Sequence, residues 1–203
     1  FAAGGYWALL FTLFIGPPEK DAEWNDQGVM GAHRFLWRVW QMVVDHAEQV
    51  KGAAGKPAAA AKLPEPLKSL HRKVHETIKR VTEDMEGDFK FNTAISAIME
   101  LINEYQKVEK FDAAGPDGLA VLRETLEHTV ILLFPFAPHM CEELWTVLGH
   151  SPSLLKVKWP KHDPKALSVD EIEVVVQVDG KVRSRMKLPS GVSAEEARNK
   201  ALV

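Results

Sequence analysis

The feature that most constrains this chain is a series of apolar stripes with helical period, followed by a change to strand period. Apolar side chains recur every three or four residues in successive segments that glycine, proline or polar links separate. Short links and matching stripes predict an antiparallel helical bundle. The expected helices are 28–51, 66–86, 92–110, 116–134 and 139–148.

Beyond Pro160 the apolar period becomes 2, which is typical of strands. Residues 171–178 and 181–188 are the expected strands, and Ser193 begins a sequence typical of a helix N-terminus. The tail is therefore predicted as a β-β-α piece, the truncated start of a small α+β domain. The fold class is mainly α, with expected boundaries at 1–27, 28–160 and 161–203.

The register of the predicted hairpin depends on its turn. A two-residue turn at Asp179-Gly180 would place valines opposite basic residues. A three-residue loop pairs Val176 with Val182 and Glu173 with Arg185, so we expect this register.

Composition excludes several classes of protein. Apolar residues make up 46% of the 203 and charged residues 26%, as in ordinary globular proteins. The net charge of -3 excludes a uniformly basic coat, so any nucleic-acid contact must come from local patches. A single cysteine, Cys141, suits a reducing compartment such as the cytoplasm.

Both ends of the sequence suggest a fragment, because it begins with Phe1 and stops just after a helix start. The longest apolar run, 6–15, is shorter than the roughly twenty residues of a membrane span. We expect it to be a core strand or helix whose packing partners lie upstream.

The expected helix 66–86 carries a local excess of basic residues, with Lys73 and Arg80 flanking a stripe that includes His75. A track for nucleic-acid phosphates and a merely solvated face are both open interpretations. The stripe on 66–86 also includes Lys68, Arg72 and Lys79. On the preceding expected helix, Arg34 and Arg38 extend it.

Two further clusters have weaker chemical interpretations. His71 and His75 have metal-ligand spacing, but without an evident third ligand we predict two surface histidines and no metal site. His139 and Glu143, near Cys141, suggest a hydrolase. No nucleophile or oxyanion motif surrounds them, so helix capping and surface charge are the favoured interpretation, and no catalytic residue is predicted.

Residues 135–145, Pro-Phe-Ala-Pro-His-Met-Cys-Glu-Glu-Leu-Trp, resemble a bundle motif of bacterial leucyl-tRNA synthetases, which are class I enzymes. The resemblance runs from about Leu10 to the end, and the order and spacing of its motifs are specific. The other matching stretches are 16–24, 31–40, 70–75, 91–101, 159–160 and 176–183. Residues 1–9 do not look like the family's sequence at this point.

The resemblance implies that 28–160 is an anticodon-binding-type bundle, between a remnant of the catalytic domain with its linker (1–27) and the start of a C-terminal tRNA-binding domain (161–203). It also implies a monomeric, cytoplasmic parent enzyme that attaches leucine to tRNA-Leu using ATP and magnesium. The fragment is expected to lack activity and to hold no cofactor, because signatures of HIGH and KMSKS type and an editing domain match nothing in it.

In this family the bundle is expected to brace the tRNA by contacting the tRNA backbone. Its expected partner within the enzyme is the remainder of the synthetase, with the catalytic and editing domains. Because the six tryptophans fall mostly on apolar stripes or boundaries, we expect them in the core. No membrane contact is expected. The alternative function is a protein-interaction helical bundle without RNA binding. The candidate tRNA-binding residues are Arg34, Arg38, Lys68, Arg72, Lys73, Lys79, Lys181 and Arg183.

Overall fold

A computed structural model of the chain describes residues 6–16, 23–58, 60–87, 89–151, 153–167, 171–178, 181–189 and 198. The chain divides into two compact units, Phe1–Ala166 and Leu167–Val203. No helix within the described ranges has both the length and the apolar character that crossing a membrane requires.

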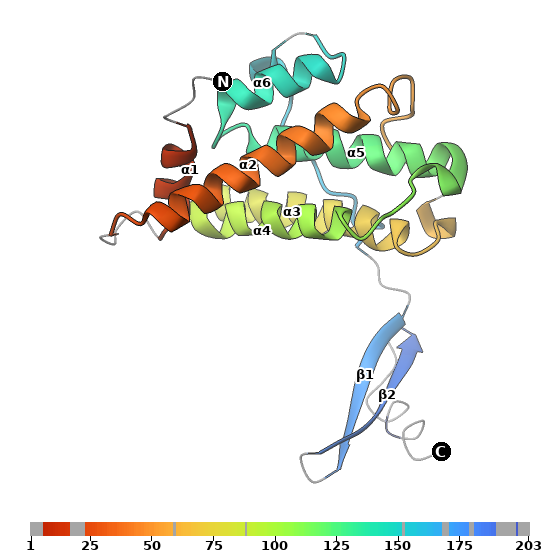
Figure 1. Cartoon of the computed structure of the whole chain (residues 1–203). Coiled ribbons are helices and arrows are strands. Elements are labelled where there is room, and N and C mark those ends of the chain that lie inside the picture. The colour runs from red at the N-terminus through yellow and green to blue at the C-terminus, as the bar shows by residue number, and fades with distance from the viewer. Residues whose placement is uncertain are drawn as a thin grey trace. The chain divides into compact units, whose positions relative to one another are not determined.

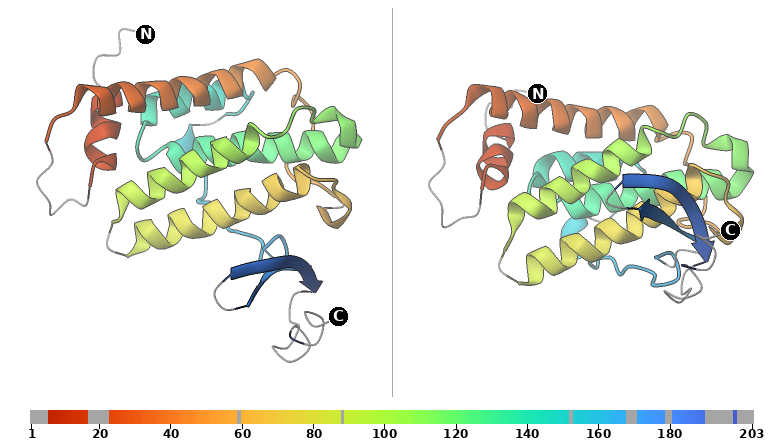
Figure 2. Two further views of the ribbon diagram at one scale, coloured as in Figure 1. Left: turned by 60° about the horizontal axis from the view of Figure 1, so that its bottom comes forward. Right: turned by 90° about the horizontal axis from the view of Figure 1, so that it is seen from below.

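The first unit is helical, and the predicted bundle is confirmed. Successive long helices run in alternating directions, as Figures 1 and 2 show. The α-helices are α1 (Tyr6–Phe14), α2 (Asp26–His46), α3 (Leu67–Glu86), α4 (Phe91–Tyr105), α5 (Gly115–Leu133) and α6 (Pro138–Val147). Short 3-10 helices lie at η1 (Ala60–Lys62), η2 (Asp112–Ala114) and η3 (Leu154–Lys156).

Helix α4 contacts α1, α3 and α5. Its side chains Ile95, Ile98 and Leu101 are fully buried. The helix ends at Tyr105, however, and not at residue 110. Turns closed by hydrogen bonds between residues three positions apart follow it, and Val108 and Phe111 beyond them are buried in the core.

The apolar run at the N-terminus packs within this chain, contrary to the expectation of upstream partners. Leu10 and Phe11 of α1 are buried in the main core against α2. Gly28 of α2 permits this packing, because a Cβ atom there would overlap the Phe11 ring. Figure 2 shows α1 crossing the start of α2 steeply.

The second unit contains an antiparallel pair, β1 (Glu171–Val178) and β2 (Lys181–Pro189). The predicted register was wrong, because Val178 pairs with Lys181 and Val176 pairs with Ser184. Between Val176 and Gln177 the pairing shifts by one residue. A β-bulge produces a shift of this kind. Beyond this shift apolar residues lie opposite each other, Val174 with Met186 and Ile172 with Leu188. The turn itself and the helix predicted from Ser193 lie outside the described residues.

Candidate nucleic-acid interface and a buried polar cluster

Two arginines of α2 lie one helical turn apart on its outer side. Arg34 is exposed, and Arg38 is half-buried with its Nη1 3.5 Å from Asn103 Oδ1 of α4. Within the described part of the chain, no carboxylate lies in ion-pair distance of either guanidinium. Both positive charges therefore remain uncompensated by these residues, which suits contact with phosphates.

The basic residues of α3 differ, because carboxylates neutralise most of them. Lys73 Nζ lies 2.7 Å from Glu100 Oε2, and Arg80 Nη1 lies 3.3 Å from Glu100 Oε1. Within the helix, Arg72 Nε lies 3.5 Å from Glu76 Oε1. Lys79 Nζ lies 3.9 Å from a carboxylate oxygen of Glu83. The sequence pattern of α3 did not show Glu100, because this carboxylate belongs to α4.

A polar pocket of about 370 Å³ lies between α3 and α4. Its ionisable lining balances cations against carboxylates, so it is less attractive to an anion than the α3 sequence alone suggests. It is lined by Ser69, Arg72, Lys73, Glu76, Glu100, Asn103, Glu104 and Lys107.

Local cations lower the pKa of two carboxyls in this pocket. The hydrogen bond from Lys73 is the main cause for Glu100, and the charges of Lys73 and Arg80 add to it against the effect of burial. Burial is the largest influence on Glu104 and raises its pKa. Hydrogen bonds from Lys107 and Ser69 and nearby positive charge together outweigh burial, so the pKa of Glu104 is also lowered. Both carboxylates stay ionised at neutral pH and hold the cations in place.

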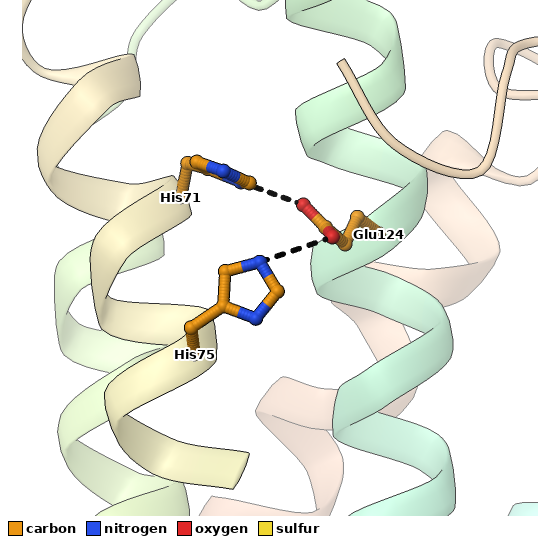
Figure 3. Close-up of side chains that lie close together, drawn as sticks. All are labelled: His71, His75 and Glu124. Atoms are coloured by element: carbon orange, nitrogen blue, oxygen red, sulfur yellow. Dashed lines mark hydrogen bonds and ion pairs between the residues drawn. The ribbon is translucent and has the colours of Figure 1, made fainter. Parts of the chain in front are cut away.

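The prediction that His71 and His75 are surface residues was wrong. They are 7% and 6% exposed, and both face Glu124 of α5, which is 3% exposed. His71 Nδ1 lies 2.7 Å from Glu124 Oε2, and His75 Nε2 lies 3.4 Å from Oε1 (Figure 3). His75 therefore does not belong to the basic face of α3. The third partner was not evident in the sequence because it lies on another helix.

Two imidazoles and a carboxylate form a plausible ligand set for a metal ion, and their ligand atoms lie within 4.8 Å of one another. The surroundings of His75 oppose this use. The backbone N–H of Asp163 donates to His75 Nδ1 at 3.2 Å, so Nδ1 carries a lone pair and Nε2 carries the proton. A metal-bound Nε2 would need its lone pair, and Nδ1–H would then face another N–H. The arrangement fits hydrogen bonding better than metal binding.

Burial alone would raise the pKa of Glu124. The hydrogen bonds that Glu124 accepts from His71 and His75 outweigh the effect of burial and lower this pKa to about 2. His128 accompanies the cluster through a 2.8 Å contact of its Nδ1 with the Glu124 carbonyl oxygen, and burial lowers the pKa of His128. Glu124 is thus an ionised acceptor that holds α3 to α5.

The geometry around Cys141 does not support the hydrolase interpretation. The thiol is fully buried, and burial, followed by the charge of Glu142, raises its pKa, so it stays protonated at neutral pH. Glu142 accepts hydrogen bonds from Ser153 Oγ at 2.5 Å and from the backbone N–H of Leu154 at 3.2 Å. It therefore holds η3 against α6, as a structural group does.

The expectation that the tryptophans are mostly core residues holds only in part. Trp145 is buried, but Trp24, Trp37 and Trp159 are 64%, 51% and 38% exposed. On α2 the large exposed apolar residues recur every seven positions, so they share one side of the helix. They are Met30, Trp37 and Val44.

Comparison with known proteins identifies the family. Residues 68–198 match the family described as the anticodon-binding domain of tRNA ligase. The chain belongs to this family. The resemblance to leucyl-tRNA synthetases is confirmed as well, because this tRNA-ligase domain is 48% identical over 202 residues to the leucine–tRNA ligase of Syntrophobacter fumaroxidans. A second leucine–tRNA ligase, from a Geobacter species, is 48% identical over 197 residues.

These alignments also show how much of the length of each ligase this chain covers. The first covers 99% of this anticodon-binding-domain chain and 24% of its relative, so the chain spans about a quarter of the ligases it matches. Because the first alignment covers 99% of the chain, residues 1–9 lie almost entirely within it.

A solved structure has the same fold. It is a crystal structure of a ternary complex of Agrobacterium radiobacter K84 agnB2 LeuRS with tRNA and LeuAMS. The TM-score is 0.80 at 27% identity, covering 97% of this chain and 24% of that one. A helical domain of this kind therefore forms part of a synthetase crystallised with tRNA.

Proposed function

We propose that this chain is the tRNA-binding part of a longer enzyme that ligates leucine to tRNA-Leu. The observation that carries the proposal is 48% identity to leucine–tRNA ligases along nearly the whole chain. The structural neighbour crystallised with tRNA supports the same role. In the proposed enzyme the bundle braces the tRNA through its backbone, and the catalytic and editing sites lie in other domains.

The proposed division keeps residues 28–160 as the bundle and 161–203 as the start of a C-terminal β-β-α domain. Residues 1–27 are assigned to the end of the catalytic domain and its linker. The complete enzyme would be a cytoplasmic monomer that contains the catalytic and editing domains in addition to this part. It would consume ATP with Mg²⁺, but the sequence of this part carries no signature that would bind them.

Within this role we rank the candidate residues by how strongly the described surroundings neutralise them. Arg34 and Arg38 are proposed as the main phosphate contacts, because no described carboxylate pairs with them. Arg72, Lys73 and Lys79 would contribute less, because each would have to leave a carboxylate to reach a phosphate. Lys68 is proposed as a flanking contact, and Lys181 and Arg183 as contacts of the C-terminal unit.

The decisive experiment is binding of tRNA-Leu to this chain from about 50 to about 200 mM salt, with a non-leucine tRNA as the control. A steep loss of affinity with salt is expected, since phosphate contacts release counterions. A preference for tRNA-Leu would place some specificity in this part. Absence of binding even at the lowest salt concentration would contradict the proposal for this chain on its own.

A protein-interaction role is the second candidate, and the exposed line of Met30, Trp37 and Val44 favours it. Aromatic side chains, methionine and arginine are enriched in protein interfaces. Association through this face would be insensitive to salt and would be weakened by Trp37→Ala. Binding of tRNA that depends on Arg34 but not on Trp37 would favour the first role.

A further inference from the structure

The segment that follows η3, residues 157–166, lies along α3. We call it the exit segment because Ala166 is the last residue of the first unit. Trp159 Nε1 donates to Thr82 Oγ1 at 2.8 Å, and the Asp163 backbone N–H donates to His75 Nδ1 at 3.2 Å. Positions 75 and 82 are about 10 Å apart along a helix, so the segment runs antiparallel to α3 between two attachment points.

Asp163 organises the final turn of the exit segment. Its carbonyl oxygen accepts from the Ala166 backbone N–H at 3.1 Å, and its Oδ1 accepts from the Lys165 backbone N–H at 2.9 Å. The backbone N–H of Asp163 is thus the group that connects this turn to α3. Its acceptor, His75, is buried, whereas Asp163 itself is exposed, so the bond is part-buried at the edge of the core.

The ability of His75 to accept depends on Glu124. A neutral imidazole has one donor and one acceptor nitrogen, and the hydrogen bond of one determines the role of the other. Because Nε2 faces the Glu124 carboxylate at 3.4 Å, that nitrogen carries the proton and Nδ1 keeps its lone pair. The His71 ring stands edge-on to the His75 ring, with centroids 4.8 Å apart, and restricts its rotation.

We propose that His75 is a positioning residue that fastens the end of the exit segment to α3, with Glu124 selecting the tautomer that makes this possible. The hydrogen-bonded series Glu124–His75–Asp163 thereby connects α5, α3 and the last turn of the exit segment. It determines the point at which the chain leaves the bundle. This role does not depend on tRNA binding and can be tested without it.

Two substitutions separate the functions of the two ring nitrogens. Asn places its Oδ1 where His has Nδ1, so His75→Asn keeps an acceptor for Asp163 and loses the donor to Glu124. Gln reaches as far as Nε2, so His75→Gln keeps the donor and loses the acceptor. Thr82→Val serves as a positive control, because it removes the other attachment of the exit segment.

The experiment is residue-resolved amide hydrogen exchange on the whole chain. In His75→Gln we expect the Asp163 amide to exchange at least about tenfold faster, while amides near Ile98 stay within about twofold. In His75→Asn we expect Asp163 to stay protected while the bundle loses global stability. Trypsin cleavage at Lys161 should accelerate in His75→Gln and in Thr82→Val.

Unchanged Asp163 exchange in His75→Gln would overturn the proposal. So would equal acceleration in both His75 variants, because that result would reflect loosened packing rather than loss of one acceptor. Failure of the wild-type chain to bind tRNA would contradict the proposed function and leave this inference intact.

Discussion

Lys73 Nζ of α3 lies 2.7 Å from Glu100 Oε2 of α4, and this contact changes the interpretation of the basic stripe. Glu100 also reaches Arg80, so one carboxylate compensates the candidate tRNA contact Lys73 and a neighbouring arginine. Exposed pairs of this kind contribute little to stability, typically ~0–1 kcal/mol. Their main effect here is on the local potential that a phosphate would meet.

Removing that carboxylate should strengthen tRNA binding. In Glu100→Gln the positive charges of Lys73 and Arg80 are released, so we expect tRNA-Leu affinity at low salt to rise by roughly threefold and the salt dependence to steepen. Fluorescence anisotropy with labelled tRNA measures both. Glu109→Gln, which alters an exposed carboxylate elsewhere, is the control. An unchanged affinity would mean that α3 lies away from the RNA.

Charge reversal should distinguish α2 from α3. We expect Arg34→Glu to weaken tRNA binding by about tenfold or more at low salt and to lower the salt slope by about 1 per lost contact. Arg72→Glu should have a smaller effect, because Glu76 already compensates that charge. Equal losses in both variants would contradict the ranking of the two helices. No loss in either would contradict the phosphate contacts themselves.

The Glu124 cluster should make stability depend on pH. The pKa of Glu124 is lowered to about 2 from 4.5, so between these values the unfolded state binds more protons than the native state. Its contribution is therefore complete above pH ~4.5 and is lost as the pH falls toward 2. Urea unfolding at several pH values measures this contribution.

The matched variant for this prediction is Glu124→Gln. At neutral pH we expect it to cost about 2–4 kcal/mol, because one histidine N–H would face an amide NH₂ group in a buried site. The difference between wild type and variant should shrink below pH ~4.5. A difference that stays constant with pH would rule out an ionised Glu124 as the source.

Gly118 should tolerate no side chain. A Cβ atom there would overlap the backbone carbonyl oxygen of Phe111, which cannot rotate away as a side chain can. We expect Gly118→Ala to destabilise the chain by about 2 kcal/mol or more through displacement of η2 from α5. Gly31→Ala is the control, because open space surrounds that position. Thermal unfolding of the two variants should differ by several degrees, and equal melting temperatures would contradict the prediction.

The sequence by itself determined the helical bundle and its family. Helix period, proline breaks and glycine links are local properties, and α3, α5 and α6 lie within one residue of their expected bounds. Motif order and spacing were enough to indicate the leucyl branch. The hairpin register was less predictable, because a bulge of one residue exchanges the positions that face each other.

Only the tertiary structure decided how the polar residues are used. His71 and Glu124 are 53 positions apart, and Lys73 and Glu100 are 27 apart. Spacings of three and four residues show which side chains share a face of one helix. They do not show which face of another helix packs against them. Apolar burial brings those faces together, and the charges then pair according to which helices meet. For that reason the sequence placed His75 on a basic surface, whereas packing placed it in the core beside Glu124.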